Sequence, residues 1–160
     1  RDRQELLMEA CRIAVDEGKF LMAWIGMVDW ETHNVLPVAA CGYEEGYLST
    51  ISVSTDNIPP GMGLTGTAIR EGRPMISNDI ASDPRMEKYW HEAARRGYRS
   101  SAAIPLICGG RAIGAIRFYA AEKNFFNDRE IQLLEELVAD ICFALELIDN
   151  DKKACPVDKG

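Results

Sequence analysis

The sequence contains few of the residues that most often bind metals or act as nucleophiles. Its two histidines are His33 and His91, and its five cysteines stand far apart, at positions 11, 41, 108, 142 and 155. Zinc sites need cysteines and histidines at short, regular spacings, which these positions do not offer. Four of the cysteines have apolar neighbours, so we expect reduced and mostly buried thiols. No Ser-His-Asp, Cys-His or paired-carboxylate arrangement stands out, and we do not expect an enzyme.

Clusters of positive charge and long apolar runs are also missing. The net charge is −7, and no basic run is longer than Arg95-Arg96 or Lys152-Lys153. Nucleic-acid surfaces need clustered cations, so nucleic-acid binding is not expected. No apolar run approaches the roughly 20 residues that cross a bilayer, and the first residues, RDRQELLMEA, lack the apolar core of a secretion signal. We therefore expect no membrane span in this stretch and a cytoplasmic location, either for the chain alone or for this stretch as the cytoplasmic part of a larger protein.

What the sequence does contain is enough apolar material for one core. It has 160 residues, of which 47% are hydrophobic, and a chain of this length buries about two-thirds of its unfolded surface in a single domain. The last stretch, DNDKKACPVDKG, is typical of a linker. We predict one domain over residues 1–149 and a linker or tail over residues 150–160.

The predicted elements follow the order helix, hairpin, loop, short helix, strand, helix, hairpin, helix. Asp2 and Glu5 can form a capping box for the first helix. Strand-length runs on both sides of ETHN, and again on both sides of Gly109-Gly110, predict two antiparallel hairpins. This order lacks the alternating βαβ units of a parallel sheet.

Two segments between the hairpins are less regular. Residues 42–63 predict a long loop that holds at most a short strand or helix. A short helix at about 65–71 and a strand at PMISN follow it. The next helix is predicted to begin at Asp83-Pro84 and to end at Gly97, since proline suits a first helical turn and glycine the residue after the last.

The final helix has the clearest signals. Asn127 and Glu130 can form a capping box while Phe126 and Ile131 occupy the hydrophobic-staple positions, so the helix should begin at 127 or 128. One apolar stripe consists of Ile131, Leu134, Val138, Ile141, Leu145 and Ile148, and a second of Leu133, Leu137, Ala144 and Leu147. One stripe can cover a sheet, and the second needs another partner. We therefore predict a homodimer through the terminal helices.

Residues 61 to 66, GMGLTG, fit the glycine pattern of a dinucleotide-binding loop, and Asp79 follows at a suitable distance. Such a loop works because a buried strand delivers it to a helix N-terminus. Here the preceding residues are STDNIPP, and the two prolines cannot donate to a sheet ladder. The following helix has room for only about two turns before Gly72. The motif therefore does not predict NAD binding.

Three stretches together resemble the GAF domain, a ligand-sensing module: GMGLTGTAIREGRPMISNDIASDP, GYRSSAAIPLICGGRAIGAIRFYA and FFNDREIQLLEELVADICFALE. The resemblance covers roughly residues 4 to 148. It implies an α+β fold, a GAF-like antiparallel β-sheet with the N- and C-terminal helices on one face. It also implies a small-molecule pocket on the other face, under short helices and loops. Gly61, Gly63 and Gly66 would then shape the turn into the short helix.

GAF domains support several chemistries, and this sequence lacks the residues that most of those chemistries require. Methionine sulfoxide reduction would need a cysteine where Thr65 stands, because the mechanism passes through sulfenic acid. Covalent bilin attachment would need a Cys-His pair. Cyclic-nucleotide-binding relatives carry an Asn-Lys, Phe, Asp-Glu signature that is matched only partly by Lys123 to Glu130, which also fits a simple helix start. Haem would rest on His91 or on Cys155-Pro156, both weak signals. The cofactor is left unknown.

Strand periodicity predicts which residues face the pocket. Ile104 and Leu106 should face the terminal helices, and so should Ile116 and Phe118, which turns Ser101, Arg117 and Tyr119 toward the ligand side. The full set of expected pocket residues is Thr65, Asn78, Asp79, Tyr89, Trp90, Ser101, Arg117, Tyr119 and Trp24. A buried arginine needs a partner. For Arg117 that partner is either Asp79, in an internal ion pair, or an anionic group on a ligand.

The predicted function is that of a small-molecule-sensing regulatory domain in a signal-transduction protein. Pocket occupancy would pass through the terminal helices to an output domain such as a histidine kinase or a diguanylate cyclase. The main alternative is a ligand-free dimerisation module. A cyclic-nucleotide-binding domain and a methionine sulfoxide reductase are the weaker alternatives.

Overall fold

A computed structural model describes residues 2–57, 61 and 63–154 of the chain, and its side chains through residue 151. The α-helices are α1 (Arg3–Asp16), α2 (Leu64–Glu71), α3 (Trp90–Arg96) and α4 (Asp128–Ala154). The strands are β1 (Met22–Val28), β2 (Val35–Gly42), β3 (Met75–Ser77), β4 (Ser100–Cys108) and β5 (Arg111–Ala120). The described part also contains the short 3-10 helices η1 (Tyr47–Thr50), η3 (Ile80–Ser82) and η4 (Pro84–Tyr89).

The strands form one antiparallel sheet in the order β2-β1-β5-β4-β3. The two predicted hairpins are therefore present, and they lie side by side through the β1–β5 pair. Their register places Ile104 opposite Ile116 and Ser101 opposite Tyr119. Because side chains alternate between the faces of a strand, each of these pairs lies on one face of the sheet. The predicted α+β fold with an antiparallel sheet is confirmed.

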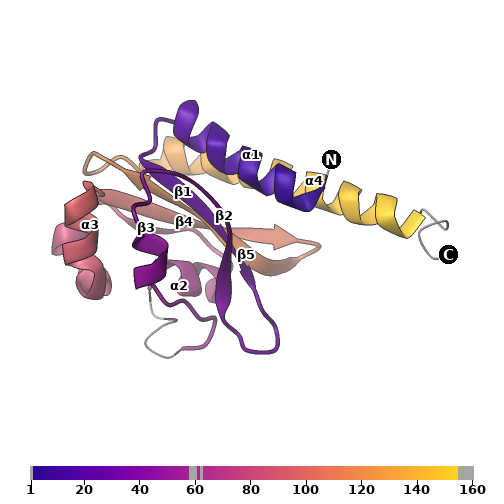
Figure 1. Cartoon of the computed structure of the whole chain (residues 1–160), viewed down its shortest axis with the longest axis horizontal. Helices are drawn as coiled ribbons and strands as arrows, with labels where there is room; N and C mark the ends of the chain where they lie inside the picture. Colours follow the sequence, from indigo (N-terminus) through magenta and orange to yellow (C-terminus); the bar gives the residue numbers. More distant parts are fainter. Residues whose placement is uncertain (1, 58–60, 62, 155–160) are drawn as a thin grey trace.

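Helices α1 and α4 lie side by side over one face of the sheet (Figure 1). Asp2 accepts a hydrogen bond from the Glu5 amide at 2.7 Å, and Asn127 accepts one from the Glu130 amide at 2.9 Å. These are the predicted helix starts. Ile104 and Phe118 belong to the core beneath the two helices, as strand periodicity predicted.

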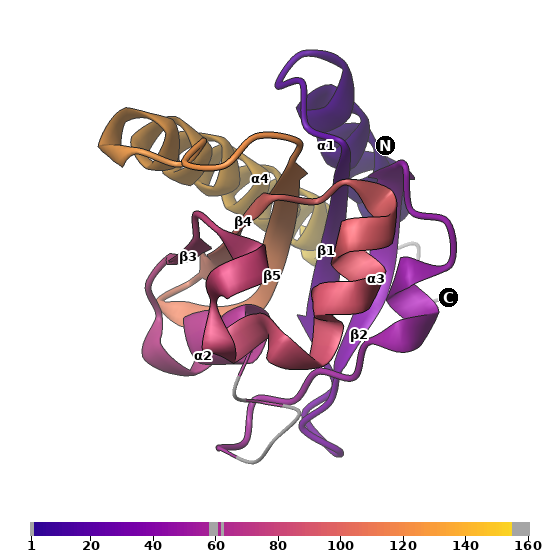
Figure 2. The same ribbon diagram turned by 90° about the vertical axis from the view of Figure 1, so that its left-hand side faces the viewer.

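The opposite face is covered by shorter pieces. Figure 2 shows α2 and α3 on the side of the sheet away from α1 and α4. Beneath them lies a second core that contains Trp24, Tyr47, Tyr98 and Tyr119. The loop predicted over residues 42–63 contributes η1 to this layer, while its residues 58–60 and 62 lie outside the described part.

The segment from Asp83 to Gly97 departs from the predicted single helix. It consists of the 3-10 helix η4 followed by α3. At its start the Asp83 side chain accepts a hydrogen bond from the Arg85 amide, and at its end Gly97 is the C-cap residue of α3. Arg96, in the last turn of α3, is buried although it carries a charge. It donates to the carbonyls of Glu44 and Glu45, so its guanidinium serves as a brace between α3 and the loop that leads to η1. A helical pattern in sequence does not reveal such a carbonyl partner.

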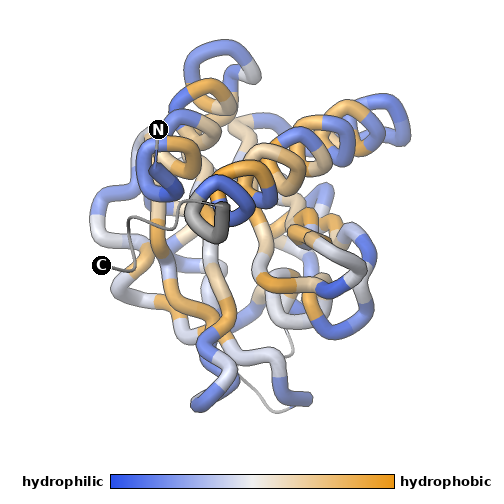
Figure 3. The backbone as a smooth tube through the Cα atoms, turned by 90° about the vertical axis from the view of Figure 1, so that its right-hand side faces the viewer, coloured by the Kyte–Doolittle hydropathy of each residue, from blue (hydrophilic) through white to orange (hydrophobic). Residues whose placement is uncertain are grey.

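The C-terminal helix extends past the expected domain boundary. Helix α4 continues to Ala154, so residues 150–154 of the predicted linker are helical. Residues 155–160, including the Cys155-Pro156 pair, lie outside the described part. Hydrophobic and hydrophilic residues alternate within the turns of α4, as expected for a helix with one face on a sheet (Figure 3). No helix in the described ranges is long and apolar enough to cross a membrane.

The expectation of reduced cysteines is wrong for two of them. Cys108, at the end of β4, and Cys142, on α4, are joined by a disulfide with Cα atoms 5.3 Å apart. They are 34 residues apart in sequence, and only the packing of α4 on the sheet brings them together. Cys11 and Cys41 are free, and burial raises the pKa of the Cys11 thiol to about 12, with a smaller contribution from Cys41.

Candidate ligand site

Arg117 lies at the centre of the second core. Arg117 is only 6% exposed, although its side chain carries a charge. Strand periodicity turns it away from α1 and α4, and its antiparallel neighbours are Ala103 on β4 and Trp24 on β1. The small Ala103 leaves room for the long side chain to lie across the sheet.

The guanidinium of Arg117 has mostly neutral partners. Its Nε donates to Ser101 Oγ at 2.7 Å, and its Nη1 donates to Thr65 Oγ1 at 3.2 Å. Nη2 lies 3.7 Å from the sulfur of Met86. The guanidinium carbon is 5.0 Å from the centre of the Tyr119 ring. No carboxylate among the described residues forms an ion pair with it.

Aromatic side chains surround this cluster. Trp24 Nε1 donates to the Tyr119 hydroxyl at 3.1 Å, and the Tyr119 and Tyr98 rings lie 4.6 Å apart. Tyr47 packs edge-on against both Tyr98 and Tyr119. Burial raises the pKa of Tyr47, the nearby Tyr119 adds to the rise, and the positive charge of Arg117 opposes it. The Tyr47 hydroxyl is therefore neutral at physiological pH and can donate a hydrogen bond.

A small hollow of about 20 Å³ opens beside Arg117, between the start of α2, the chain at Ile51–Val53 and η4. We call it the inner hollow. Thr65, Met86 and Tyr89 lie on its wall with Arg117. A hollow of this size accepts about one water-sized group.

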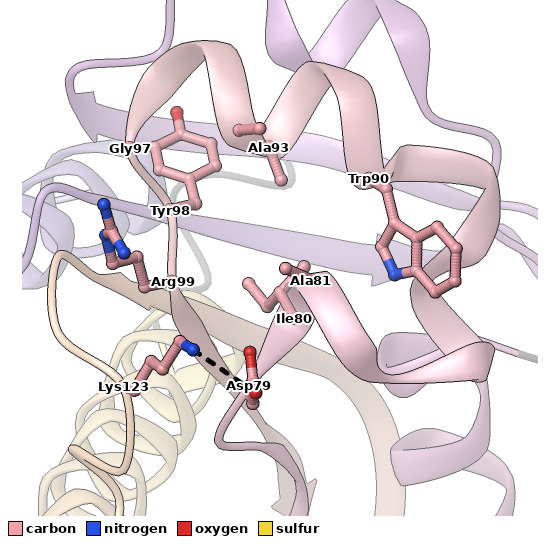
Figure 4. A pocket seen from close by; sticks show the side chains of 10 residues that line it. Asp79, Ile80, Ala81, Trp90, Ala93, Gly97, Tyr98, Arg99 and Lys123 are labelled. Atoms are coloured by element: carbon pink, nitrogen blue, oxygen red, sulfur yellow. Dashed lines mark ion pairs between the residues drawn. The ribbon is translucent and has the colours of Figure 1, made fainter.

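A larger cavity of about 170 Å³ lies between η3, α3 and the start of β4. We call it the outer cavity. Figure 4 shows Asp79 and Lys123 paired at one end of it and Trp90 on the far side of Ile80 and Ala81. Asp79 Oδ2 lies 3.6 Å from Lys123 Nζ, whereas the buried Asp79 Oδ1 has no hydrogen-bond partner among the described residues. Tyr98 lines the outer cavity and contacts Tyr119, so one ring separates it from the Arg117 cluster.

The structure brings most of the predicted site residues together. Thr65, Ser101, Arg117, Tyr119 and Trp24 form one contiguous cluster. Tyr89 lines the inner hollow, while Asp79 and Trp90 line the outer cavity.

Asn78 lies elsewhere. Its side-chain nitrogen donates to the Phe126 carbonyl at 2.9 Å, and its side-chain oxygen accepts from the Phe126 amide at 3.0 Å. Asn78 lines neither the inner hollow nor the outer cavity, and its role in the structure is to fix the start of α4. A polar residue after a short strand gives no sequence signal that separates these two roles.

The internal ion pair considered for Arg117 does not form among the described residues. Asp79 faces the outer cavity and pairs with Lys123.

Four further residues belong to the site but were not predicted: Tyr47, Met86, Tyr98 and Lys123. Tyr47 lies in the segment whose structure the sequence did not define. Tyr98 follows the glycine that ends α3, where an aromatic residue before a strand could have indicated a buried position. Lys123 was considered only as part of a cyclic-nucleotide signature.

The described residues contain no group of three or more His, Cys, Asp and Glu side chains that could hold a metal. His91 is exposed on α3. The described cysteines lie away from the Arg117 cluster, and none lines the inner hollow or the outer cavity. The arrangement offers binding groups, namely a cation, hydroxyls and aromatic rings, and the described linings of the two cavities contain no thiol.

The sequence matches the family model for the GAF domain over residues 1–146. None of the curated proteins compared with it matches significantly.

Solved structures show the same fold at low sequence identity. The GAF domain region of a putative membrane protein from Geobacter sulfurreducens PCA is 19% identical with a TM-score of 0.76, covering 91% of this chain and 94% of that one. A domain of a putative two-component sensor histidine kinase from Sinorhizobium meliloti 1021 is 16% identical with a TM-score of 0.72, covering 96% and 97%. Free methionine-R-sulfoxide reductase from Neisseria meningitidis, in complex with its substrate, is 19% identical with a TM-score of 0.74, covering 94% and 81%.

Proposed function

The chain belongs to the GAF domain family, and from that premise we propose that it is the small-molecule-sensing regulatory domain of a signal-transduction protein. Its ligand lies on the sheet face that α2, η4 and α3 cover. The output domain is a histidine kinase or a cyclase elsewhere in the full-length chain, and the protein works in the cytoplasm. The similarity to a domain of a putative sensor histidine kinase supports this setting.

One observation carries the proposal. A charged side chain, Arg117, is buried in the middle of a core with neutral partners, next to a hollow and a larger cavity. Burying a cation without a counter-charge costs free energy, and a protein retains such an arrangement where binding compensates for it. A domain that served only as a scaffold would be more stable with an apolar residue at this position.

Signal transmission follows from the alternation of β5. Arg117 stands between Ile116 and Phe118, which pack under α1 and α4. A ligand that shifts Arg117 therefore also shifts the strand on which both helices rest. A ligand can shift the helices only if it binds one of their two arrangements more tightly than the other. The usual coupling free energy between ligand binding and such a shift is about 1 to 3 kcal/mol.

We do not assign catalysis. The similarity to methionine sulfoxide reductases is one of fold alone, and that chemistry needs a thiolate next to the substrate. Thr65 occupies the position expected for such a cysteine. The cyclic-nucleotide alternative loses support as well, because Asn127 caps α4, Lys123 pairs with Asp79 and Phe126 packs in the core.

A ligand-free dimerisation module is the second candidate, because part of the predicted second stripe of α4 is uncovered. Leu133 and Leu147 of that stripe are exposed, and so is Phe143, which was not assigned to it. Leu137 is partly covered, since it lies with Leu6 and Ala10 of α1 along the groove between the two helices. We therefore also propose a homodimer through the terminal helices, which is compatible with sensing.

Native mass spectrometry of the purified protein separates the two functions. We expect a dimer in which each chain retains or exchanges a small molecule, and we expect that mass to disappear in the Arg117→Met variant. A dimer that is empty after expression, and that binds nothing from a metabolite extract, would leave the dimerisation module as the function.

A further inference from the structure

The N-terminus of α2 opens into the inner hollow. Gly63, Leu64, Thr65 and Gly66 all line it. Gly63 is the N-cap residue and provides no side-chain hydrogen bond to the first turn of this eight-residue helix. The first amides of a helix have no partner within the helix, and the helix dipole makes this end favourable for negative charge.

Gly63 is the glycine of GMGLTG that the described structure does not itself require. A Cβ at Gly61 would lie 1.8 Å from the Asp56 carbonyl oxygen and one at Gly66 would lie 2.3 Å from the Ser54 carbonyl oxygen, so both must be glycine for packing. A Cβ at Gly63 would meet no described atom within 4 Å. Its φ of −80° is also open to other residues. The missing side chain leaves space beside the guanidinium.

Arg117 still has hydrogen-bonding capacity toward this space. A guanidinium carries five N–H groups, and the described residues accept from one on each nitrogen: Ser101, Thr65 and, through a long contact, Met86. One N–H on each of Nη1 and Nη2 is left. The charge has no ion-pair partner among the described residues, and Arg117 itself lines the inner hollow.

The size of the inner hollow and the residues on its walls indicate which class of anion could bind there. The inner hollow accepts about one water-sized group, so a carboxylate oxygen can enter it while the body of the ligand lies at its mouth. A flat carboxylate suits so small an opening better than a tetrahedral phosphate does. The other walls of the inner hollow are mostly apolar or aromatic, with Ile51, Val53, Leu64 and Tyr89 among them.

We propose that the inner hollow is a carboxylate subsite, in which Arg117 and the first amides of α2 bind the carboxylate of a small monocarboxylic acid with a compact apolar body. Gly63 leaves the space for the carboxylate to reach both donors. The inference rests on the proposed sensing function and names its ligand class.

The test uses matched pairs of acids and amides on the intact chain. Binding of benzoate and isovalerate is measured by calorimetry and by the shift in thermal unfolding, against benzamide, isovaleramide and inorganic phosphate. At roughly millimolar concentrations we expect saturable stabilisation by at least one acid and none by its amide or by phosphate. Equal binding of an acid and its amide, binding of phosphate alone, or no binding of either acid overturns the proposal.

Two variants and one control locate the site. Arg117→Met should weaken the binding of the acid at least tenfold, and Gly63→Val should do the same by filling the open space. Arg129→Met removes an exposed arginine of α4 that lines neither the inner hollow nor the outer cavity, and it should leave the affinity unchanged. If Arg117→Met does not fold, the result with Gly63→Val decides. Acid binding that survives in Gly63→Val, or that is lost in Arg129→Met, overturns the assignment of the subsite.

These outcomes separate the inference from the proposed function. If native mass spectrometry finds a bound neutral molecule while both acids fail to bind, sensing stands and the carboxylate subsite is wrong. If the chain is an empty dimer and binds neither the acids nor anything from the extract, both proposals fail together.

Discussion

Asp83 shows how a single side chain can fix the start of an irregular segment. Its carboxylate accepts hydrogen bonds from the Arg85 amide at 3.0 Å and from Arg85 Nη2 at 2.7 Å. The same Nη2 donates to the Ile76 carbonyl, which ties η4 to β3. The Arg85 hydrogen bond, opposed in part by burial, lowers the pKa of Asp83 from 3.8 to about 2. The pairing also raises the pKa of Arg85.

This pKa predicts an acid-dependent contribution to stability. Because the pKa of the folded state is lowered, the contribution is complete above pH 3.8 and is lost as the pH falls toward about 2. We expect Asp83→Asn to lower the free energy of unfolding by about 1 kcal/mol at pH 7, after allowing for the exposure of Arg85. In urea denaturation the difference from wild type should shrink as the pH falls below 4.

Asp83→Ser provides the control, because serine can cap the helix without a charge. It should lose the charge-dependent part of the stability and show a flatter pH profile than wild type. A constant difference between Asp83→Asn and wild type from pH 7 to pH 3 would contradict the pKa argument.

Helix α4 is attached to the sheet by more than its apolar stripe. Asn78 holds the Phe126 backbone just before its first turn, and the Cys108–Cys142 disulfide holds its middle. Glu146 accepts from the Gly109 amide at 3.1 Å, which adds a polar contact one turn further on. The helix that would carry a signal is thus fixed to the β4–β5 turn at two neighbouring points.

The disulfide should contribute measurably to stability. A crosslink over a loop of this length restricts the unfolded chain and typically contributes about 2–4 kcal/mol. We therefore expect tris(2-carboxyethyl)phosphine to lower the unfolding midpoint of the wild type to that of the Cys108→Ser/Cys142→Ser double variant. The double variant itself should not respond to the reductant.

Cys41→Ser is the matched control for that measurement. It removes a free, half-buried thiol and should leave the response to reductant intact. If reductant leaves the wild-type midpoint unchanged, the disulfide does not contribute to stability.

At the scale of the molecule, the two faces of the sheet have separate roles. One face supports the paired helices α1 and α4, and the other carries the cluster around Arg117. Leu134 and Val138, which belong to the first apolar stripe of α4, are buried in the core beneath it, so charge placed there would unfold the domain. The dimer surface, if it forms, must use the exposed part of α4.

The dimer prediction is therefore best tested at Phe143, which is 63% exposed. We expect wild-type protein to sediment as a dimer at high micromolar concentration and Phe143→Glu to sediment as a folded monomer. Val138→Lys is the contrasting variant, and it should lose the unfolding transition. Wild type that is strictly monomeric at these concentrations would refute the proposal.

The sequence predicted the fold well because its strongest signals are local. The caps at Asp2 and Asn127, the two hairpins and the alternation of β4 and β5 each depend on residues within a few positions of one another. The same alternation correctly turned Arg117, Ser101 and Tyr119 toward one face. The segment from 42 to 63 was predicted only as a long loop, because its short 3-10 helix η1 and the isolated β-bridge between Asn34 and Ser54 carry no periodic pattern.

By itself, the sequence determined the antiparallel architecture, the faces of its strands and helices, and the arginine at the centre of one face, since these follow from local hydrogen bonding and periodicity. Only the tertiary structure decided the partners. It formed the ion pair between Asp79 and Lys123, the hydrogen bond from Asn78 to Phe126, and the disulfide between Cys108 and Cys142. It also left Arg117 with neutral neighbours beside the open end of α2. The physical reason is distance: an ion pair, a disulfide or a cavity joins groups that are far apart in sequence, and their meeting depends on how the layers pack.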